Sequence, residues 1–244
     1  MIVLSFVFFL SGKVFAANEA SFSEANTKYQ SGDFKGAAEL YEKAVGAGER
    51  SGSLYYNLGN TYFRVGKKGQ ALAAYERAKL LLPRDKDIEW NMNILKSVLT
   101  DRLEAPDDNI AVFWLKEAAA KLTLDELAAS VMLLLSIFLL MILVTLLLPR
   151  LRLLPQFIQV LIVPVAALAI VLFAFKWWNL KEPRVVVLDK EIYAHYGPSQ
   201  KETKAFLLHE GAEARVLDES KDWIYITLDN KSSGWIPRAS CEVI

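Results

Sequence analysis

The sequence predicts a multidomain α plus β protein, in which helical repeats come first, a two-helix membrane hairpin second and a small β domain last. Three observations predict it: a 34-residue spacing recurs near the N-terminus, two long uncharged apolar runs follow, and the pattern changes to a period of two from Arg184 onward. The hydrophobic share of 53% is high for a wholly water-soluble chain of 244 residues, which favours a part in lipid. The 28 basic and 28 acidic residues balance, whereas nucleic-acid binding requires a clustered excess of Lys and Arg, so nucleic acid is not an expected partner.

Residues 1–16 are predicted to be a secretory signal peptide. Residues 2–10 are apolar but too few to span a membrane, and Val14, Phe15 and Ala16 then place small residues where signal peptidase requires them. Lys13 lies after the apolar stretch, whereas the basic residues of a typical signal precede it. We expect cleavage after Ala16 and export of the chain that follows.

Residues 18–105 are predicted to be helical repeats followed by a capping helix. Glycines, alanines and tyrosines coincide when the sequence is shifted by one repeat period: Gly32 with Gly66, Ala37 with Ala71, Tyr41 with Tyr75, and Ala44 with Ala78. This pattern resembles the tetratricopeptide repeat, and one unit fills all the signature positions of that family: Tyr55, Leu58, Gly59, Tyr62, Ala71, Tyr75, Ala78 and Pro83. We expect Gly59 and Ala71 to let two antiparallel helices approach closely, while Tyr62 and Tyr75 fill the space around them.

The repeat array is expected to be incomplete on its own. Its first unit, from about residue 18, is degenerate, because Ser21 and Glu24 stand where a large aromatic residue and a leucine are expected. After Pro83, apolar residues at helical spacing predict a helix that caps the second unit: Ile88, Met92, Leu95, Leu99 and Leu103. Two units and a cap fall short of the roughly three repeats that a stable array needs, so we expect the membrane or a partner to complete the packing.

The resemblance implies that the first helix of each unit lines a groove that binds a partner. The residues expected at this groove are Asn26, Tyr29, Tyr56, Asn57, Asn60, Phe63, Arg64, Trp90 and Asn91. Asn26 and Asn60 are one repeat period apart, as are Asn57 and Asn91, and an amide can donate and accept hydrogen bonds, so a ladder of them suits an extended peptide. Asparagines at such places also cap or solvate helices, which leaves both interpretations open.

Residues 106–126 are predicted to form an amphipathic connector helix. Its apolar side comprises Ile110, Phe113, Trp114 and Leu115. Two interpretations remain open: the helix lies on the membrane surface, or it packs on the repeats. Thr123 and Glu126 have the spacing of a capping box, so we expect the membrane helix to begin there.

Two uncharged apolar runs predict a transmembrane hairpin. Residues 127–148 would span roughly 33 Å as a helix, enough to cross a bilayer core. Residues 157–175 form the second predicted span and contain Pro164, which a membrane helix accepts more readily than a soluble one. Residues 149–156 join the two and carry Arg150 and Arg152, which favour the cytoplasmic side. With an exported N-terminus, both soluble domains are expected to be periplasmic, on a bacterial inner membrane.

Residues 184–244 are predicted to form a small β domain. Short β-branched and aromatic runs alternate with turn residues, and the chain ends in "GWIPRASCEVI". This order resembles the bacterial SH3-like barrel. We expect Trp223 and Trp235 to be mostly core, because so small a barrel has little else to fill it. Tyr193, Tyr196 and Pro198 fall in the loop region where SH3-like domains tend to bind peptides or glycans, and they are the expected ligand residues of this domain.

The sequence offers little for catalysis or metal binding. With two histidines, His195 and His209, and one cysteine, Cys241, no closed zinc site, redox pair or Cys–His dyad with a plausible local partner can be assembled. We therefore expect no metal, no cofactor and no enzymatic activity. Each histidine is expected to be a surface or packing residue, and burial of Cys241 in the last strand is favoured over a cysteine available for an intermolecular bond.

The order of these modules is similar to the BatE family, encoded in the Bacteroides aerotolerance type of operon. The resemblance implies an inner-membrane protein whose periplasmic domains join other Bat-type membrane proteins, including von Willebrand A-domain proteins, in a complex for aerotolerance or stress tolerance. The alternative is a membrane protein that binds peptidoglycan through its SH3-like domain. A hydrolase is the third possibility, disfavoured because no nucleophile–base pair is visible.

Overall fold

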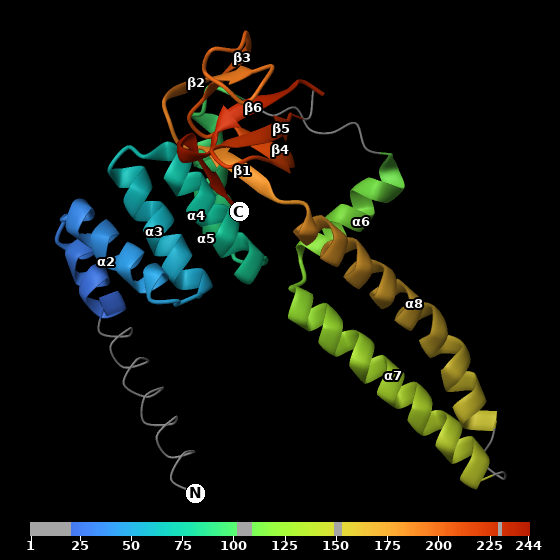
Figure 1. Cartoon of the computed structure of the whole chain (residues 1–244). Helices are drawn as coiled ribbons and strands as arrows, with labels where there is room; N and C mark the ends of the chain where they lie inside the picture. Colours follow the sequence, from blue (N-terminus) through green and yellow to red (C-terminus); the bar gives the residue numbers. More distant parts are fainter. Residues whose placement is uncertain (1–20, 102–108, 149–152, 229–230) are drawn as a thin grey trace, which may run out of the picture. The chain divides into compact units, whose positions relative to one another are not determined.

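The structure, a computed structural model, describes residues 21–101, 109–148, 153–228 and 231–244 (Figure 1). The chain divides into two compact units. The first combines Met1–Pro106 with Pro183–Ile244 and is called here the repeat–sheet unit; the second, Asp107–Glu182, is called the hairpin unit. The predicted signal peptide, residues 1–16, and the loop arginines Arg150 and Arg152 lie outside the described residues.

The repeat–sheet unit begins with antiparallel helices. Residues 21–30 are helical, and they are followed by α2 (Phe34–Gly46), α3 (Gly52–Arg64), α4 (Lys68–Leu81) and α5 (Lys86–Ser97). The turns recur with the sequence repeat: Gly32 and Gly66, at equivalent positions of successive units, both adopt a positive φ, at 86° and 82°, which a residue with a side chain rarely adopts. Ser51 and Asp85 begin α3 and α5 by accepting hydrogen bonds from backbone N–H groups of the first turn.

Small residues allow the repeat helices to pack closely. A Cβ atom placed at Gly59 would lie 2.6 Å from Cδ1 of Tyr75, well inside contact distance, and Ala71 is fully buried. Tyr75 is itself buried, with 1% of its surface exposed. The predicted role of Gly59 and Ala71 is thus confirmed. The predicted capping stripe is also buried where the structure describes it, at Ile88, Met92, Leu95 and Leu99; Leu103 lies outside the described residues.

Within the described residues, seven strands form one antiparallel sheet. They are β1 (Arg184–Val187), β2 (Glu191–His195), β3 (Lys204–His209), β4 (Glu213–Glu219), β5 (Trp223–Thr227), β6 (Ser233–Pro237) and β7 (Cys241–Val243), in the spatial order β3-β2-β6-β5-β4-β1-β7. The expectation of a closed barrel is wrong, because β3 and β7 form the two edges. β7 is only three residues long and pairs with β1, and β2 joins β6 through the single register pair His195 and Trp235.

The two sheet faces differ in their side chains. Ile224, Ile226 and Ile236 are fully buried in the sheet core, with other Val, Ile, Leu and Ala side chains. Trp223 and Trp235 alternate with them along β5 and β6 and are only half-buried, so the expectation that both are mostly core is wrong. The period-two alternation of a strand sends these tryptophans to the opposite face, while aliphatic residues suffice to fill the core.

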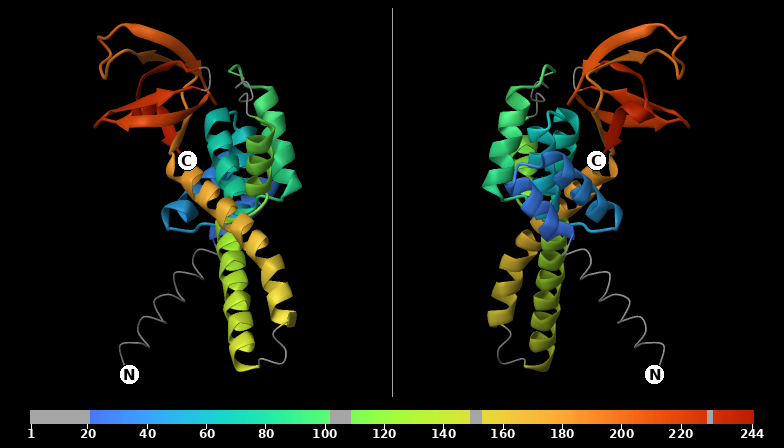
Figure 2. Two further views of the ribbon diagram at one scale, coloured as in Figure 1. Left: turned by 90° about the vertical axis from the view of Figure 1, so that its right-hand side faces the viewer. Right: turned by 90° about the vertical axis from the view of Figure 1, so that its left-hand side faces the viewer.

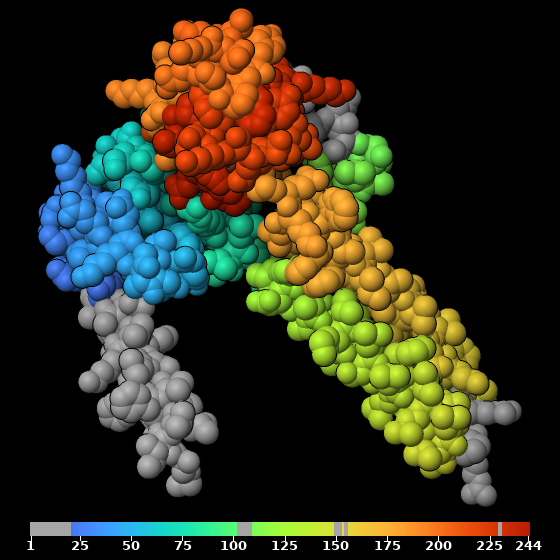
Figure 3. All heavy atoms as spheres, in the orientation of Figure 1, coloured from blue at the N-terminus to red at the C-terminus, as the bar shows by residue number. Residues whose placement is uncertain are grey.

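The repeats and the sheet meet at a hydrophobic interface, called here the seam. Val185 and Val187 belong to the sheet core, whereas Val186, between them, is fully buried in a cluster with residues of α4 and α5 such as Leu72 and Leu95. A Cβ atom at Gly69 would lie 2.4 Å from the carbonyl oxygen of Val187, so the first turn of α4 touches the strand backbone. Figure 3 shows the sheet seated against these helices.

Charged groups frame this seam. Glu213 and Glu242 are the cross-strand partners of Val186, so all three face the repeats. Lys96 Nζ lies 2.8 Å from Glu213 and 2.9 Å from Glu76 of α4, while Arg77 pairs with Glu242. Burial opposes the charge of Lys96, but the two carboxylates outweigh it and raise its pKa.

A loop-to-strand contact extends the seam. Both oxygens of Asp101 bind His209, one accepting from the backbone N–H at 2.7 Å and the other lying 2.8 Å from Nδ1. The element that completes the short repeat array is therefore the C-terminal sheet of the same chain. The expectation that the membrane or a separate partner completes the packing of the repeats is wrong. Strand β1 does so, because it buries apolar side chains on both of its faces, one against the sheet core and the other against the repeat helices.

The hairpin unit consists of α6 (Ile110–Ala120), α7 (Leu124–Leu147) and α8 (Leu153–Lys181). The predicted capping box is confirmed: Thr123 Oγ1 accepts from the N–H of Glu126 at 3.1 Å, and Glu126 accepts from the N–H of Thr123 at 2.9 Å. It sets the start of α7 at Leu124, before the apolar run. α8 begins inside the predicted loop 149–156 and continues past residue 175, with Pro164 inside the helix.

α7 and α8 lie side by side (Figures 1 and 2). Leu124–Leu147 and Gln156–Lys181, of 24 and 26 residues, are each long and apolar enough to cross a membrane. In the most apolar stretch of each helix, only 6% and 11% of the residues, respectively, are buried inside the structure. Their exposed surfaces are thus suited to contact lipid.

Candidate partner-binding site

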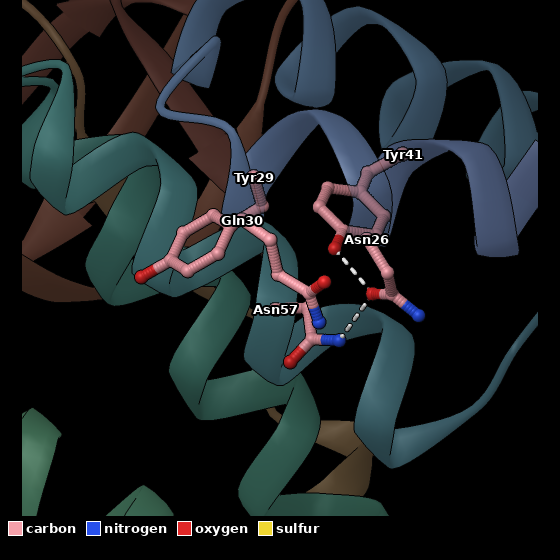
Figure 4. Close-up of a pocket in the computed structure, with 5 residues that line it drawn as sticks. All are labelled: Asn26, Tyr29, Gln30, Tyr41 and Asn57. Atoms are coloured by element: carbon pink, nitrogen blue, oxygen red, sulfur yellow. Dashed lines mark hydrogen bonds between the residues drawn. The ribbon is translucent and has the colours of Figure 1, made fainter.

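A triad of polar side chains joins the first repeat to the second. Asn26 Oδ1 accepts hydrogen bonds from the Tyr41 hydroxyl at 2.6 Å and from Asn57 Nδ2 at 3.0 Å (Figure 4). Asn26 lies on the helix of residues 21–30, Tyr41 on α2 and Asn57 on α3, so the triad fixes three consecutive helices to one another. Burial raises the pKa of Tyr41 to about 12, so its hydroxyl remains a donor well into the alkaline range.

The same triad recurs one repeat later. Asn60 Oδ1 accepts from the Tyr75 hydroxyl at 2.6 Å and from Asn91 Nδ2 at 2.8 Å. Asn91 Nδ2 also donates to the Tyr56 hydroxyl at 2.9 Å, and burial raises the pKa of Tyr75 above its ordinary value. The structure therefore brings all the predicted groove asparagines together in two repeating networks, at the same junction of successive units.

The first triad borders a pocket, called here the amide pocket. Its volume is about 380 Å³, and its lining residues are Asn26, Tyr29, Gln30, Tyr41 and Asn57. Figure 4 shows the Gln30 amide and the Asn57 amide facing the same space. Within the part of the chain that the structure describes, Asn57 Oδ1 and Asn26 Nδ2 have no hydrogen-bond partner, so each triad amide keeps one free polar atom.

Gln30 and Tyr41 are absent from the predicted groove residues. Tyr41 aligns with Tyr75 in the repeat, but this alignment is as consistent with a packing role as with a binding site. Gln30 aligns with Arg64, a predicted groove residue, so applying the repeat spacing to Arg64 would have identified it. The pocket lining carries no charged side chain.

The other predicted groove residues have different surroundings. Phe63 and Trp90 are exposed, at 36% and 68% of their surfaces. The Arg64 guanidinium lies over the Phe34 ring, 4.5 Å from its centroid, so this cation is engaged within the chain. Phe63 and Trp90 therefore remain available to apolar side chains of a partner, and Arg64 is less free than either of them.

The predicted ligand residues of the β domain are exposed. Tyr193 lies in β2, not in a loop as expected, and the Lys204 ammonium is 3.7 Å from its ring centroid. Tyr196 and Pro198 follow β2 in the loop, and Tyr196 is 70% exposed. Because Ile192 and Ala194 point into the core, Tyr193 lies on the opposite face of the sheet.

Half-buried aromatic residues continue this face across β5 and β6. We call the set Tyr193, Trp223, Tyr225 and Trp235 the aromatic face. The rings of Tyr225 and Trp235 are 5.1 Å apart between centroids and tilted by 32°, and Trp223 meets His195 edge-on. His195 is buried, and its Nδ1 lies 2.9 Å from the carbonyl oxygen of Glu202, so it packs within the domain.

The described residues bring together no group of three His, Cys, Asp or Glu side chains of the kind that holds a metal ion. Cys241 is a free thiol, half-buried against the sheet core, and burial raises its pKa to about 11. A thiol of that pKa is mostly protonated at neutral pH and is a poor nucleophile.

Comparison with known proteins identifies one repeat unit. The family described as Tetratricopeptide repeat matches residues 52–85, from the first residue of α3 to Asp85, the N-cap of α5. No curated protein matches the chain. Among solved structures, the chain is similar to an NlpC/P60 family protein from Bacillus cereus ATCC 10987, with 18% identity and a TM-score of 0.23 over 28% of this chain and 22% of that one. The chain thus spans about a fifth of the length of that structure.

Proposed function

We propose that this protein is a membrane-anchored adaptor without catalytic activity. It binds an extended segment of a protein partner at the amide pocket and at the second triad, one repeat later. The tetratricopeptide unit at residues 52–85 supports a role in protein–protein interaction. The observation that carries the proposal is the pair of matching triads, which hold side-chain amides in fixed orientations with one polar atom of each left free.

The chemistry of the pocket suits a peptide backbone. A free acceptor, Asn57 Oδ1, and a free donor, Asn26 Nδ2, complement the N–H and C=O groups of an extended chain. Holding these amides in place before binding avoids part of the entropy cost of ordering them. Exposed Phe63 and Trp90 supply apolar surface for side chains of the same segment. Because the pocket lining is uncharged, binding should depend little on salt.

We place the two apolar helices, α7 and α8, across the membrane. The repeats and the sheet form one unit although the hairpin unit separates them in the chain, so they must share one side of the membrane, which requires an even number of crossings. The predicted signal peptide and the loop arginines Arg150 and Arg152 support the periplasmic side. The resemblance of the module order to the BatE family supports a Bat-type partner, such as a von Willebrand A-domain protein.

Photo-crosslinking from the amide pocket tests this function. A photoreactive amino acid at exposed Gln30 of the full chain should capture a protein in living cells. Asn57→Ala should lower the yield about five- to tenfold, the effect of losing one interface hydrogen bond of about 1 kcal/mol. Protease added to intact spheroplasts should digest the captured product, because the pocket is placed outside the inner membrane.

A matched control separates pocket chemistry from general damage. Asn93 is exposed on α5 outside both triads, so Asn93→Ala should leave the yield unchanged. Equal yields from wild-type protein and Asn57→Ala would refute binding at the pocket. A product that resists external protease until the spheroplasts are lysed would refute the periplasmic placement alone.

A second candidate function is binding to peptidoglycan through the aromatic face and the neighbouring Tyr196. The specific observation in its favour is that tryptophans and tyrosines outside the sheet core share one side of the sheet, where Tyr193 is exposed and Trp223, Tyr225 and Trp235 are half-buried. Aromatic rings of this kind stack on the apolar faces of sugars.

Retention on purified sacculi tests the second candidate. The detergent-solubilised full chain should be retained, and Tyr196→Ala should weaken retention, because Tyr196 is 70% exposed and its ring can reach a ligand without repacking. Leu217→Ala, a change at another exposed apolar residue, on β4, is the control and should have no effect. No retention of the wild-type chain would rule this candidate out while leaving the adaptor function intact.

A further inference from the structure

The groove that carries the two triads changes its chemistry at α5. The first helices of successive repeat units are residues 21–30, α3 and α5, and the repeat spacing aligns three positions of each helix. The aligned sets are Phe22, Tyr56 and Trp90; Asn26, Asn60 and Ile94; and Gln30, Arg64 and Val98. At the second and third positions the first two helices carry polar or charged side chains, whereas α5 carries two aliphatic ones. The third layer of the groove is therefore apolar where the first two layers are polar.

The three side chains of this third layer are uncovered. We call Trp90, Ile94 and Val98 the apolar stripe; they are exposed over 68%, 40% and 48% of their surfaces. The contacts that hold α5 in the repeat–sheet unit come from its other side, where Met92 and Leu95 are buried in a cluster with α4 and β1. The apolar stripe is thus a second apolar side of α5, separate from the one that the core uses.

The apolar stripe is continuous with the second triad. Asn91 Nδ2 donates to Asn60 Oδ1 at 2.8 Å and to the Tyr56 hydroxyl at 2.9 Å, so this side of α5 faces the triad. At about 100° per residue of an α-helix, Ile94 and Val98 point within about 60° of the direction of Asn91. A segment that contacts both triads therefore reaches the apolar stripe next.

The spacing of the repeat helices sets the length of segment that joins the two chemistries. The triad hydrogen bonds run directly from one first helix to the next, so these helices are in contact. Packed helices lie about 8–10 Å apart, which puts the amide pocket and the apolar stripe, two helices away, about 16–20 Å from each other. An extended chain that rises about 3.3 Å per residue covers this distance in about five to six residues.

We infer that the segment bound in the groove has two parts, with uncharged polar side chains over the amide pocket and large apolar side chains over the apolar stripe, about five to six residues away. The inference rests on the proposed peptide-binding function and names the class of ligand for it. Apolar side chains gain by displacing water from the stripe. A charged side chain would lose water there without gaining a partner, because the guanidinium of Arg64, aligned with Val98, lies over the Phe34 ring.

Selection from a phage-displayed library of random dodecapeptides tests the inference on the full chain in phosphatidylcholine nanodiscs. Enriched peptides should carry an aromatic or aliphatic cluster near one end and uncharged polar residues near the other. The affinity of the corresponding synthetic peptides should fall about five- to tenfold in Asn57→Ala, which removes one hydrogen-bonding amide. It should fall at least about tenfold in Trp90→Ala, because exposed tryptophans are typical anchors of a bound partner.

Ile94→Asn is the sharpest variant, because asparagine is the residue that the repeat already has at Asn26 and Asn60. The side chain is exposed, so the fold should be kept, which far-UV circular dichroism checks. Peptides selected on the wild-type chain should bind this variant about five- to tenfold more weakly. A new selection on the variant should replace an apolar residue of the peptide by a polar one. Leu217→Asn makes the same kind of change at an exposed residue of β4 and should alter neither result.

The other outcomes separate this inference from the function on which it rests. Peptides whose binding depends on Asn57 but not on Trp90 or Ile94 would overturn the two-part ligand and leave peptide binding at the amide pocket intact. Peptides that depend on the apolar stripe alone, or that become helical when bound, would show a different kind of site and overturn the inference as well. If the library yields no binder, or only binders indifferent to all three substitutions, the proposed peptide binding itself fails.

Discussion

Val186→Asp is expected to lower the free energy of unfolding of the repeat–sheet unit by about 3–5 kcal/mol, the usual cost of an uncompensated buried charge. Val186 is fully buried between β1 and the repeat helices, and its cross-strand neighbours are the acidic residues Glu213 and Glu242. A third carboxylate there would have no cation to neutralise it, because Lys96 is already paired with Glu213 and Arg77 with Glu242. Denaturation of the detergent-solubilised chain, followed by far-UV circular dichroism, measures the loss.

Val243→Asp is the control for this substitution. It makes the same chemical change in the adjacent strand β7, at a residue that is 38% exposed, and should cost no more than about 1 kcal/mol. If both variants lose the same small amount of stability, then the seam between the repeats and the sheet contributes little, and the two would be independent domains.

Tyr75→Ala is expected to cost about 3–5 kcal/mol of unfolding free energy, the range measured for large aromatic residues cut back in a core. The ring is 1% exposed, fills the space that Gly59 leaves open, and its hydroxyl donates to Asn60. Removal therefore leaves a cavity and also takes away one of the two donors to Asn60 Oδ1. The same denaturation experiment measures the effect.

Tyr75→Phe separates the two contributions. It keeps the ring and removes only the hydroxyl, so the expected cost is about 1 kcal/mol, that of one hydrogen bond. Because Asn60 would then lose a fixed partner, this variant should also bind a groove ligand more weakly. The loss of affinity should exceed what the loss of stability alone explains. A Phe variant as unstable as the Ala variant would contradict the importance of ring packing.

The features that follow from local periodicity could be predicted from the sequence. The repeat spacing located the helix pair α3 and α4 and the small residues at their contact, because a fixed repeat period requires equivalent positions to pack alike. The capping box at Thr123 depends on residues three apart, and the hairpin depends on the length of apolar runs. Such signals need no knowledge of the tertiary fold.

The remaining features depend on contacts between distant segments. Whether Trp235 points to the core or away from it is decided by strand register, and a shift of one residue reverses the answer. The asparagines were predicted as a ladder, but their partner tyrosines, Tyr41 and Tyr75, lie on the other helix of each unit. The burial of Val186 against α4 and α5 joins residues on either side of the hairpin unit, and nothing near it in the sequence indicates that contact.

That long-range contact bears on how the protein is made. Synthesis delivers the N-terminal helices well before β1 and β7, and both apolar helices emerge from the ribosome in between. Until the last strands arrive, the apolar surface of α4 and α5 around Leu72 and Leu95 has nothing to cover it, a state that favours aggregation and proteolysis. Folding of the repeat helices is therefore complete only after β1 has been synthesised, and a chain that stops before β1 exposes the apolar surface that Val186 would cover.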